Sequence, residues 1–157
     1  MIPLVHFGLT SEDINNTAYS LMTKGATKNI MVPAIKNVLK ELKKLARRTK
    51  SLPMLSLTHG QPATTTTLGK ELAVFISRIE RELVLINEIN LLAKFSGATG
   101  SYAAHKAAFP KANWSVFAKK FIKRLGLGQS PITSQIEPGD SIACLLYTSP
   151  SPRDGSI

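Results

Sequence analysis

The residues best suited to chemistry lie in the heptapeptide THGQPAT, residues 58–64. It places His59 between a threonine and a glycine, with a glutamine and a proline close behind. A free imidazole titrates near pH ~6.5, so such a group can give or take a proton around neutrality. A long apolar pattern with helical spacing follows and would hold this loop at a helix start. His59 is therefore a candidate acid–base group, and a polar loop residue is the alternative interpretation.

A second polar group marks another predicted helix start, at Thr10-Ser11-Glu12-Asp13. Thr10 can cap the helix, and Asp13 lies three residues on, as in a capping box with Asp in place of Glu. From the residues alone, Thr10 and Ser11 need be no more than a helix cap.

The sequence offers no pattern for a metal centre. His6, His59 and His105 lack the short helical spacing of a zinc site. Cys144 is the only cysteine, so neither a disulfide framework nor a cysteine-rich metal site is expected. We expect no metal and no organic cofactor.

Composition points to a globular chain. Its 157 residues are typical of one domain, and a hydrophobic content of 43% is enough for a core. No apolar run approaches the ~20 residues that a membrane span needs. The first residues lack the charged and apolar regions of a signal peptide, so we expect a cytoplasmic protein without membrane partners.

The net charge of +10 invites a nucleic-acid interpretation. The low aromatic content, 6%, offers few platforms for stacking bases. The charge is equally compatible with an anionic small-molecule substrate, so we do not expect nucleic acid as a partner. A basic helical nucleic-acid-binding module remains the alternative. Six of the basic residues in this chain recur at three- and four-residue steps, as on one solvated helix face, which weakens that alternative: Lys36, Lys40, Lys43, Lys44, Arg47 and Arg48.

Periodicity predicts an all-α protein with long antiparallel helices and no strands. The third helix would be ~45 Å long at 1.5 Å per residue, which is typical of a large bundle or oligomer. The connections would be loops, and Gly25 would end the first helix. The expected helices cover about residues 10–24, 28–50, 65–94 and 113–125, and the expected loops 51–63, 95–112 and 126–142.

The final segment differs from the rest. Residues 144–157, CLLYTSPSPRDGSI, lose the helical pattern and resemble translated read-through of a sequencing adapter. We interpret residues 1–143 as the natural domain fragment and 144–157 as a non-native tail. A natural disordered tail is the alternative.

Four segments in register carry a family resemblance: HFGLTSEDINN, LTHGQPATTTTLGKE, KFSGATGSYAAH and TSQIEPGD, at residues 6–16, 57–71, 94–105 and 133–140. Together they resemble the bacterial form of the adenylosuccinate lyase family, in the fumarase/aspartase superfamily. The resemblance implies a truncated part of that superfamily's central helical bundle. It also implies a cytoplasmic homotetramer in the complete enzyme.

The resemblance implies β-elimination of fumarate from adenylosuccinate, giving AMP, and from the succinyl-carboxamide ribotide of purine biosynthesis. In the family pattern, His59 would be the catalytic general acid, and Thr10, Ser11 and Gln135 would bind substrate. The base would be a serine on a downstream loop whose pattern does not occur here, so we expect the chain alone to be inactive. Another lyase of the superfamily is the alternative.

Several positions depart from the family pattern. Thr65 stands where a proline is usual, and Gly139 where a histidine is common. Ser96, Ser101 and Ala104 stand where asparagines are frequent. Substrate positioning near residues 96–104 and 139 is where we expect this chain to differ.

Overall fold

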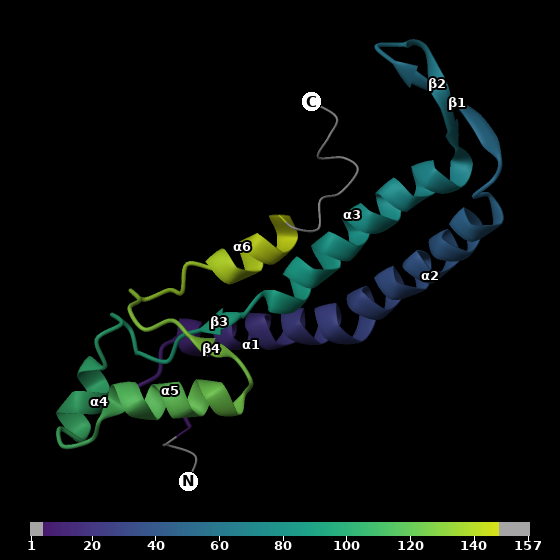
Figure 1. The fold of residues 1–157 in the computed structure, drawn as a ribbon. Coiled ribbons are helices and arrows are strands. Elements are labelled where there is room, and N and C mark those ends of the chain that lie inside the picture. Colours follow the sequence, from purple (N-terminus) through teal and green to yellow (C-terminus); the bar gives the residue numbers. More distant parts are fainter. Residues whose placement is uncertain (1–4, 148–157) are drawn as a thin grey trace. The chain divides into compact units, whose positions relative to one another are not determined.

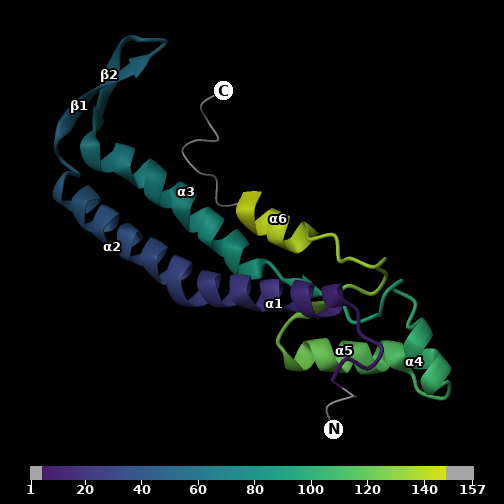
Figure 2. The same ribbon diagram turned by 180° about the vertical axis from the view of Figure 1, so that it is seen from behind.

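A computed structural model describes residues 5–147. The chain divides into two compact units. The first combines Met1–Ala26 with Ile89–Ile157, and the second is Thr27–Glu88. Both are mostly helical with a few short strands, as Figures 1 and 2 show from opposite sides. The expectation of an all-α chain is thus right about the dominant element and wrong about the absence of strands.

The first unit begins with helix α1 (Ser11–Ala26). The backbone N–H of Thr10 donates to Asp13 Oδ2 over 3.0 Å, which is the carboxylate half of the predicted capping box. Gly25 does not end the helix, contrary to prediction. It is not among the glycines with positive φ, so it lacks the left-handed conformation of a glycine stop. The chain continues directly into a π-helical turn, η2 (Thr27–Met31).

A small apolar core holds the first unit together. Strands β3 (Leu92–Ala93) and β4 (Gly128–Gln129) pair in parallel beside helix α5 (Trp114–Arg124). The side-chain oxygen of Asn113 caps α5 by accepting from the Val116 N–H, as expected for a helix starting there. The core is formed by Leu91, Ala93, Ile122 and Leu127, all nearly or fully buried.

Two further helices belong to this unit. Helix α4 (Ala103–Ala108) interrupts the segment predicted as a loop over residues 95–112. Helix α6 (Asp140–Tyr147) continues across the boundary proposed after residue 143, and Leu145 on it is buried. The proposed non-native origin of residues 144–157 stays a prediction, and residues 148–157 lie outside the described part of the chain.

The second unit is built on a helix pair. Helices α2 (Val32–Arg48) and α3 (Leu68–Glu88) lie side by side in Figures 1 and 2. Pro33 occupies the first turn of α2, where its missing N–H costs no hydrogen bond. The Gly69 N–H donates to Thr49 O over 3.1 Å, whereas Lys43 pairs with Glu80 farther along. The order of these contacts makes the pair antiparallel.

A β-hairpin joins the two helices where a loop was predicted. Strands β1 (Pro53–Thr58) and β2 (Gln61–Thr67) pair antiparallel, with Thr58 opposite Gln61. His59 and Gly60 form the turn, with φ of 52° and 74°. Two positive φ values in a two-residue turn match the twist of a hairpin. The β-branched threonines after Gln61 favour the second strand.

The predicted third helix is correspondingly too long. Residues 65–67 belong to β2, so α3 begins at Leu68 and ends at Glu88. Residues 92–93 were also predicted to be helical. They form strand β3 instead, because their backbone pairs with β4. Ser20 on α1 donates to the Leu92 carbonyl over 2.6 Å, which further fixes this strand. Tertiary pairing has overridden the helical periodicity here.

Candidate functional site

A buried carboxylate lies at the start of α1. Asp13 is only 3% exposed and accepts four hydrogen bonds. Its Oδ1 accepts from Lys94 Nζ over 2.8 Å and from the Ser96 N–H over 3.0 Å. Its Oδ2 accepts from the N–H groups of Thr10 and Gly97 over 3.0 and 3.1 Å. One side chain thus joins the helix start to the glycine-rich segment.

Lys94 completes this buried centre. Its side chain is fully buried and pairs with Asp13, and Nζ also donates to the Gly97 carbonyl over 3.1 Å. A buried ammonium is tolerated only when it is paired and hydrogen-bonded, as here. Burial raises the pKa of the Asp13 carboxyl, but hydrogen bonds from Lys94, Thr10 and Ser96 and the Lys94 charge outweigh it. The pKa of Asp13 therefore lies below its ordinary value, and its carboxyl is ionised at neutral pH.

The same network reaches the TSQIEPGD segment. Asn16 accepts from the Lys94 backbone N–H over 3.0 Å and donates to Glu137 Oε2 over 3.2 Å. Glu137 Oε2 also accepts from the Gly139 N–H over 2.8 Å. The hydroxyls of Ser96 and Thr133 lie 2.8 Å apart. Three of the four motifs identified in the sequence therefore meet in one hydrogen-bonded cluster.

Glycine permits the closest approach within this cluster. At Gly100, with φ +74°, a Cβ atom would lie 1.9 Å from the Thr133 carbonyl oxygen. Neither the conformation nor the contact admits a side chain. Tyr102, which precedes α4, is also left-handed at φ 59°. Strained backbone of this kind persists only where the surroundings fix it, and it concentrates at functional sites.

The predicted substrate-binding residues belong to this cluster or neighbour its members in the chain. Thr10 is half-buried and Ser11 is exposed at the first turn of α1. Gln135 is exposed and lies between Thr133 and Glu137, which both bond into the cluster. The first unit therefore anchors the backbones around these three residues through one polar network. Their roles in binding stay predictions.

His59 lies in the second unit, at the tip of the β1–β2 hairpin. Its side chain is exposed, and its left-handed backbone is fixed by the two-residue turn. On β1 and β2, Ser56 Oγ donates to the Thr64 carbonyl, which strengthens the strand pairing. An exposed imidazole on a defined turn can exchange protons with a bound ligand, which fits the predicted acid role.

His105 is the buried histidine of the first unit. It is fully buried, and neither ring nitrogen has a hydrogen-bond partner within residues 5–147. The ring lies among Phe7, Phe95 and Trp114, with centroids 4.8–5.8 Å away. Gly8, at φ +65°, leaves room for it, since a Cβ there would lie 2.6 Å from Nε2. This packing agrees with a structural histidine rather than a catalytic one.

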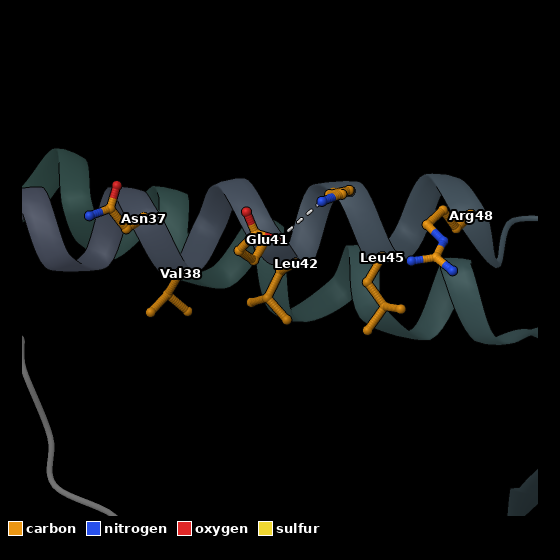
Figure 3. Close-up of a pocket in the computed structure, with 7 residues that line it drawn as sticks. Asn37, Val38, Glu41, Leu42, Leu45 and Arg48 are labelled. Carbon is orange, nitrogen blue, oxygen red and sulfur yellow. Dashed lines mark ion pairs between the residues drawn. The ribbon is translucent and has the colours of Figure 1, made fainter.

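The second unit also has shallow grooves. One, of about 600 Å³, runs along α2, where Val38, Leu42 and Leu45 point to the same side (Figure 3). Glu41 pairs with Lys44 beside it. The groove is mainly apolar, and it has neither a histidine nor a buried ionisable group. It is better suited to packing than to catalysis.

The basic stripe of α2 borders α3. A second groove, of about 590 Å³, is lined by Lys36, Lys40 and Arg47 together with residues of α3. Lys43 pairs with Glu80 over 2.5 Å, so part of the charge is neutralised within the unit. The stripe is otherwise mostly exposed, as predicted for a solvated face.

Among residues 5–147, no group of three or more His, Cys, Asp or Glu side chains has a metal-binding arrangement. None of the helices in that range is both long and apolar enough to cross a membrane.

The motifs are visible in the sequence, but the buried Asp13–Lys94 pair is not. Asp13 was recognised only as a capping residue, and Lys94 was placed inside a helix. The one signal for a buried ion pair in the sequence is the position of Lys94, between an apolar run and the glycine-rich FSGATG. A lysine that is buried in such surroundings needs a partner. Which carboxylate pairs with it depends on contacts 81 residues apart in the chain.

Comparison with known proteins assigns this arrangement to a family. The family model described as lyase matches residues 3–149, which is almost the whole chain. The chain therefore belongs to this lyase family.

Its relatives include proteins named adenylosuccinate lyase. The one from Buchnera aphidicola subsp. Acyrthosiphon pisum is 50% identical over 139 residues, covering 88% of this chain and 30% of the relative. Those of Vibrio cholerae and Escherichia coli K12 are 46% and 44% identical, each covering 90% of this chain and 31% of the relative. The chain spans about 30% of the length of the curated relatives it matches.

Solved structures give the same assignment. A fumarate lyase from Mesorhizobium sp. BNC1 matches with a TM-score of 0.80 at 28% identity, covering 93% of this chain and 34% of that one. The β-carboxy-cis,cis-muconate cycloisomerase of Acinetobacter calcoaceticus sp. ADP1 matches with a TM-score of 0.78 at 30% identity, covering 93% and 33%. The fold is thus shared with enzymes of different named activity, so the substrate must be argued separately.

Proposed function

We propose that this chain is part of an adenylosuccinate lyase. The reaction would be β-elimination of fumarate from adenylosuccinate, giving AMP, and from the succinyl-carboxamide ribotide of purine biosynthesis. The observation that carries this proposal is 44–50% identity, over about 90% of the chain, to relatives bearing that name. The match to a cycloisomerase structure, by contrast, is only 30% identical.

The proposed general acid is His59. Elimination breaks a C–N bond, so the departing nitrogen must receive a proton while a base removes one from Cβ. An exposed imidazole on the defined β1–β2 turn is able to supply that proton near neutral pH. In this proposal, no metal or organic cofactor is needed to polarise the substrate.

Thr10, Ser11 and Gln135 are proposed to bind the anionic substrate. The hydroxyls of Thr10 and Ser11 lie at the N-terminus of α1, whose backbone N–H groups favour negative charge. The Gln135 amide can both donate and accept. The support from the structure is that Thr10 bonds to Asp13 through its backbone and that Thr133, two residues before Gln135, bonds to Ser96. Ser11 and Gln135 are exposed.

The chain by itself is proposed to be inactive. In the family pattern the base is a serine on a loop whose sequence does not occur in these 157 residues. An acid without its base leaves the Cβ proton in place, so elimination does not proceed. Fumarate release by the purified chain that is lost on His59→Asn substitution would overturn this point.

The complete enzyme is proposed to be a homotetramer with long antiparallel helices in a central bundle. Exposed apolar side chains on both helices of the second unit support this, among them Val38 and Leu45 on α2 and Phe75 and Val84 on α3. Such surfaces mark association faces. Sedimentation of the product of the complete reading frame should give four copies, and a monomer would contradict the proposal.

The role of His59 is tested by replacing it with asparagine. Asparagine tolerates the left-handed backbone and favours this turn before glycine, so His59→Asn removes the imidazole while keeping the hairpin. In the product of the complete reading frame, kcat for adenylosuccinate should fall by about 10²–10⁴-fold, the usual contribution of a general acid. KM should change little.

Thr65→Val on the same hairpin is the matched control, because Thr65 is exposed and keeps its β-branched shape. It should retain the parent kcat. If His59→Asn also retains it, His59 is not the acid.

A further inference from the structure

The four hydrogen bonds of Asp13 link separate parts of the proposed substrate site. Its Oδ2 accepts from the Thr10 N–H, which fixes the residue immediately before Ser11. Its two oxygens also accept from the N–H groups of Ser96 and Gly97. A single buried carboxylate therefore ties the start of α1 to the glycine-rich segment.

The linkage extends to the segment that carries Gln135. Ser96, held by Asp13 through its backbone, places its hydroxyl 2.8 Å from that of Thr133. Thr133 lies two residues before Gln135 in the chain. Gly100 seats the glycine-rich segment directly against the Thr133 backbone. A displacement at Asp13 would thus be transmitted to both sides of the proposed site.

We propose that Asp13 is a positioning residue for substrate binding: it sets Thr10 and Ser11 in register with Gln135 by holding the glycine-rich segment between them. This inference rests on the proposed function, because that function assigns ligand contact to these three residues. Asp13 is fully engaged with protein donors and is buried. It therefore acts through its neighbours and does not touch the substrate.

Only a carboxylate fits the donors that converge here. A carboxylate accepts at both oxygens, whereas an amide replaces one oxygen with an NH₂ donor. In Asp13→Asn, the NH₂ group would face either Lys94 and the Ser96 N–H or the N–H groups of Thr10 and Gly97. Two donors facing each other without an acceptor separate, so the segments should shift apart.

The first test uses hydrogen exchange in the purified chain. Asp13→Asn should accelerate exchange of the Thr10, Ser96 and Gly97 amides at least 10-fold. The Gly128 amide, bonded to Leu91 O in the core of the same unit, is an internal reference that should stay protected. Glu82→Gln, the same carboxylate-to-amide change at an exposed position of α3, should alter none of these amides.

The second test separates positioning from stability in the product of the complete reading frame. Asp13→Asn should raise KM for adenylosuccinate about 100-fold, the scale of a 1 Å misplacement, with a smaller change in kcat. The single variant also leaves Lys94 buried without its counter-charge and lowers Tm. In Asp13→Asn combined with Lys94→Met, that unpaired charge is gone, so Tm should recover while KM stays high.

The outcomes are distinct. Recovery of both Tm and KM in the double variant would show that Asp13 only stabilises the fold and would overturn the proposal. If Asp13→Asn does not fold, the KM of the double variant alone decides: a high KM supports the positioning role, and the parent KM overturns it. If the unsubstituted protein does not cleave adenylosuccinate, the proposed function fails. The positioning role is then judged by exchange, and unchanged Thr10 and Gly97 amides would overturn it.

Discussion

Two buried polar groups of the first unit contrast at the scale of single residues. Asp13 and Lys94 satisfy each other and the surrounding backbone, so their burial fixes one arrangement of two segments, the start of α1 and residues 94–97. His105 is equally buried but has no hydrogen-bond partner within residues 5–147. The ionised carboxylate of Asp13 strengthens the first arrangement, whereas burial of the His105 ring disfavours its charged form.

His105 should make the first unit sensitive to mild acid. Burial lowers the pKa of His105, and the nearby Asp13 charge only partly opposes this. Below the ordinary histidine pKa of ~6.5, the unfolded chain then binds a proton that the folded chain does not. The free energy of unfolding should therefore fall as pH drops through ~6.5 towards the lowered pKa.

The check is urea denaturation of the chain at several pH values between about 7.5 and 5. His105→Leu should flatten this part of the stability profile, whatever its effect at neutral pH. His59→Asn, which removes an exposed histidine of the other unit, is the matched control. Equal slopes in the parent chain and His105→Leu would contradict the assignment. Asp13 does not affect this comparison, because its lowered pKa changes the free energy of unfolding only as pH falls below about 5.

The candidate residues illustrate what a sequence can reveal at this scale. His59, Thr10, Ser11 and Gln135 stand in motifs whose residue types already suggest proton transfer and anion binding. The burial of Lys94 has no comparable signal, because its partner lies far away in the chain. Local pattern thus indicates which residues are chemically apt, while long-range pairing decides which of them are buried.

At the scale of elements, local sequence again predicts some helices, whereas pairing between segments decides where the strands lie. Helix α5 was predictable because Asn113 and an amphipathic pattern specify it locally, and the structure confirms it as Trp114–Arg124. The β1–β2 hairpin was missed because its turn is His-Gly rather than the usual Asn-Gly. Strand β3 was missed because only its pairing with β4 makes it extended.

Gly100 provides an element-scale test of how the glycine-rich segment seats. Gly100→Ala combines left-handed strain, about 1–3 kcal/mol, with a clash against the Thr133 backbone. Gly139→Ala is the matched control in the same unit, with φ +80° and no atom within 4 Å of the added Cβ. Both should lower the free energy of unfolding, and Gly100→Ala should lower it more.

Thermal unfolding followed by circular dichroism measures the difference. Gly100→Ala should also accelerate exchange of the Gly97 amide, because the segment moves off Asp13. Equal destabilisation by the two substitutions would show that the close contact with Thr133 is not maintained in solution.

At the scale of the whole molecule, membership of the lyase family is established by a match over residues 3–149. The chain spans about 30% of the length of its curated relatives. His59 lies in one compact unit, and Thr10, Ser11 and Gln135 in the other. Under the proposed function, the chain carries the proton donor in one unit and substrate-binding residues in the other.

The most direct measurement is substrate turnover by the product of the complete reading frame, followed as fumarate release from adenylosuccinate, argininosuccinate and malate and as cycloisomerisation of β-carboxymuconate. We expect kcat/KM for adenylosuccinate to exceed that for each of the others by at least about 10³-fold, because a site built for one substrate leaves polar groups unpaired with the rest. Preference for any of the other three, or no elimination from adenylosuccinate, would contradict it.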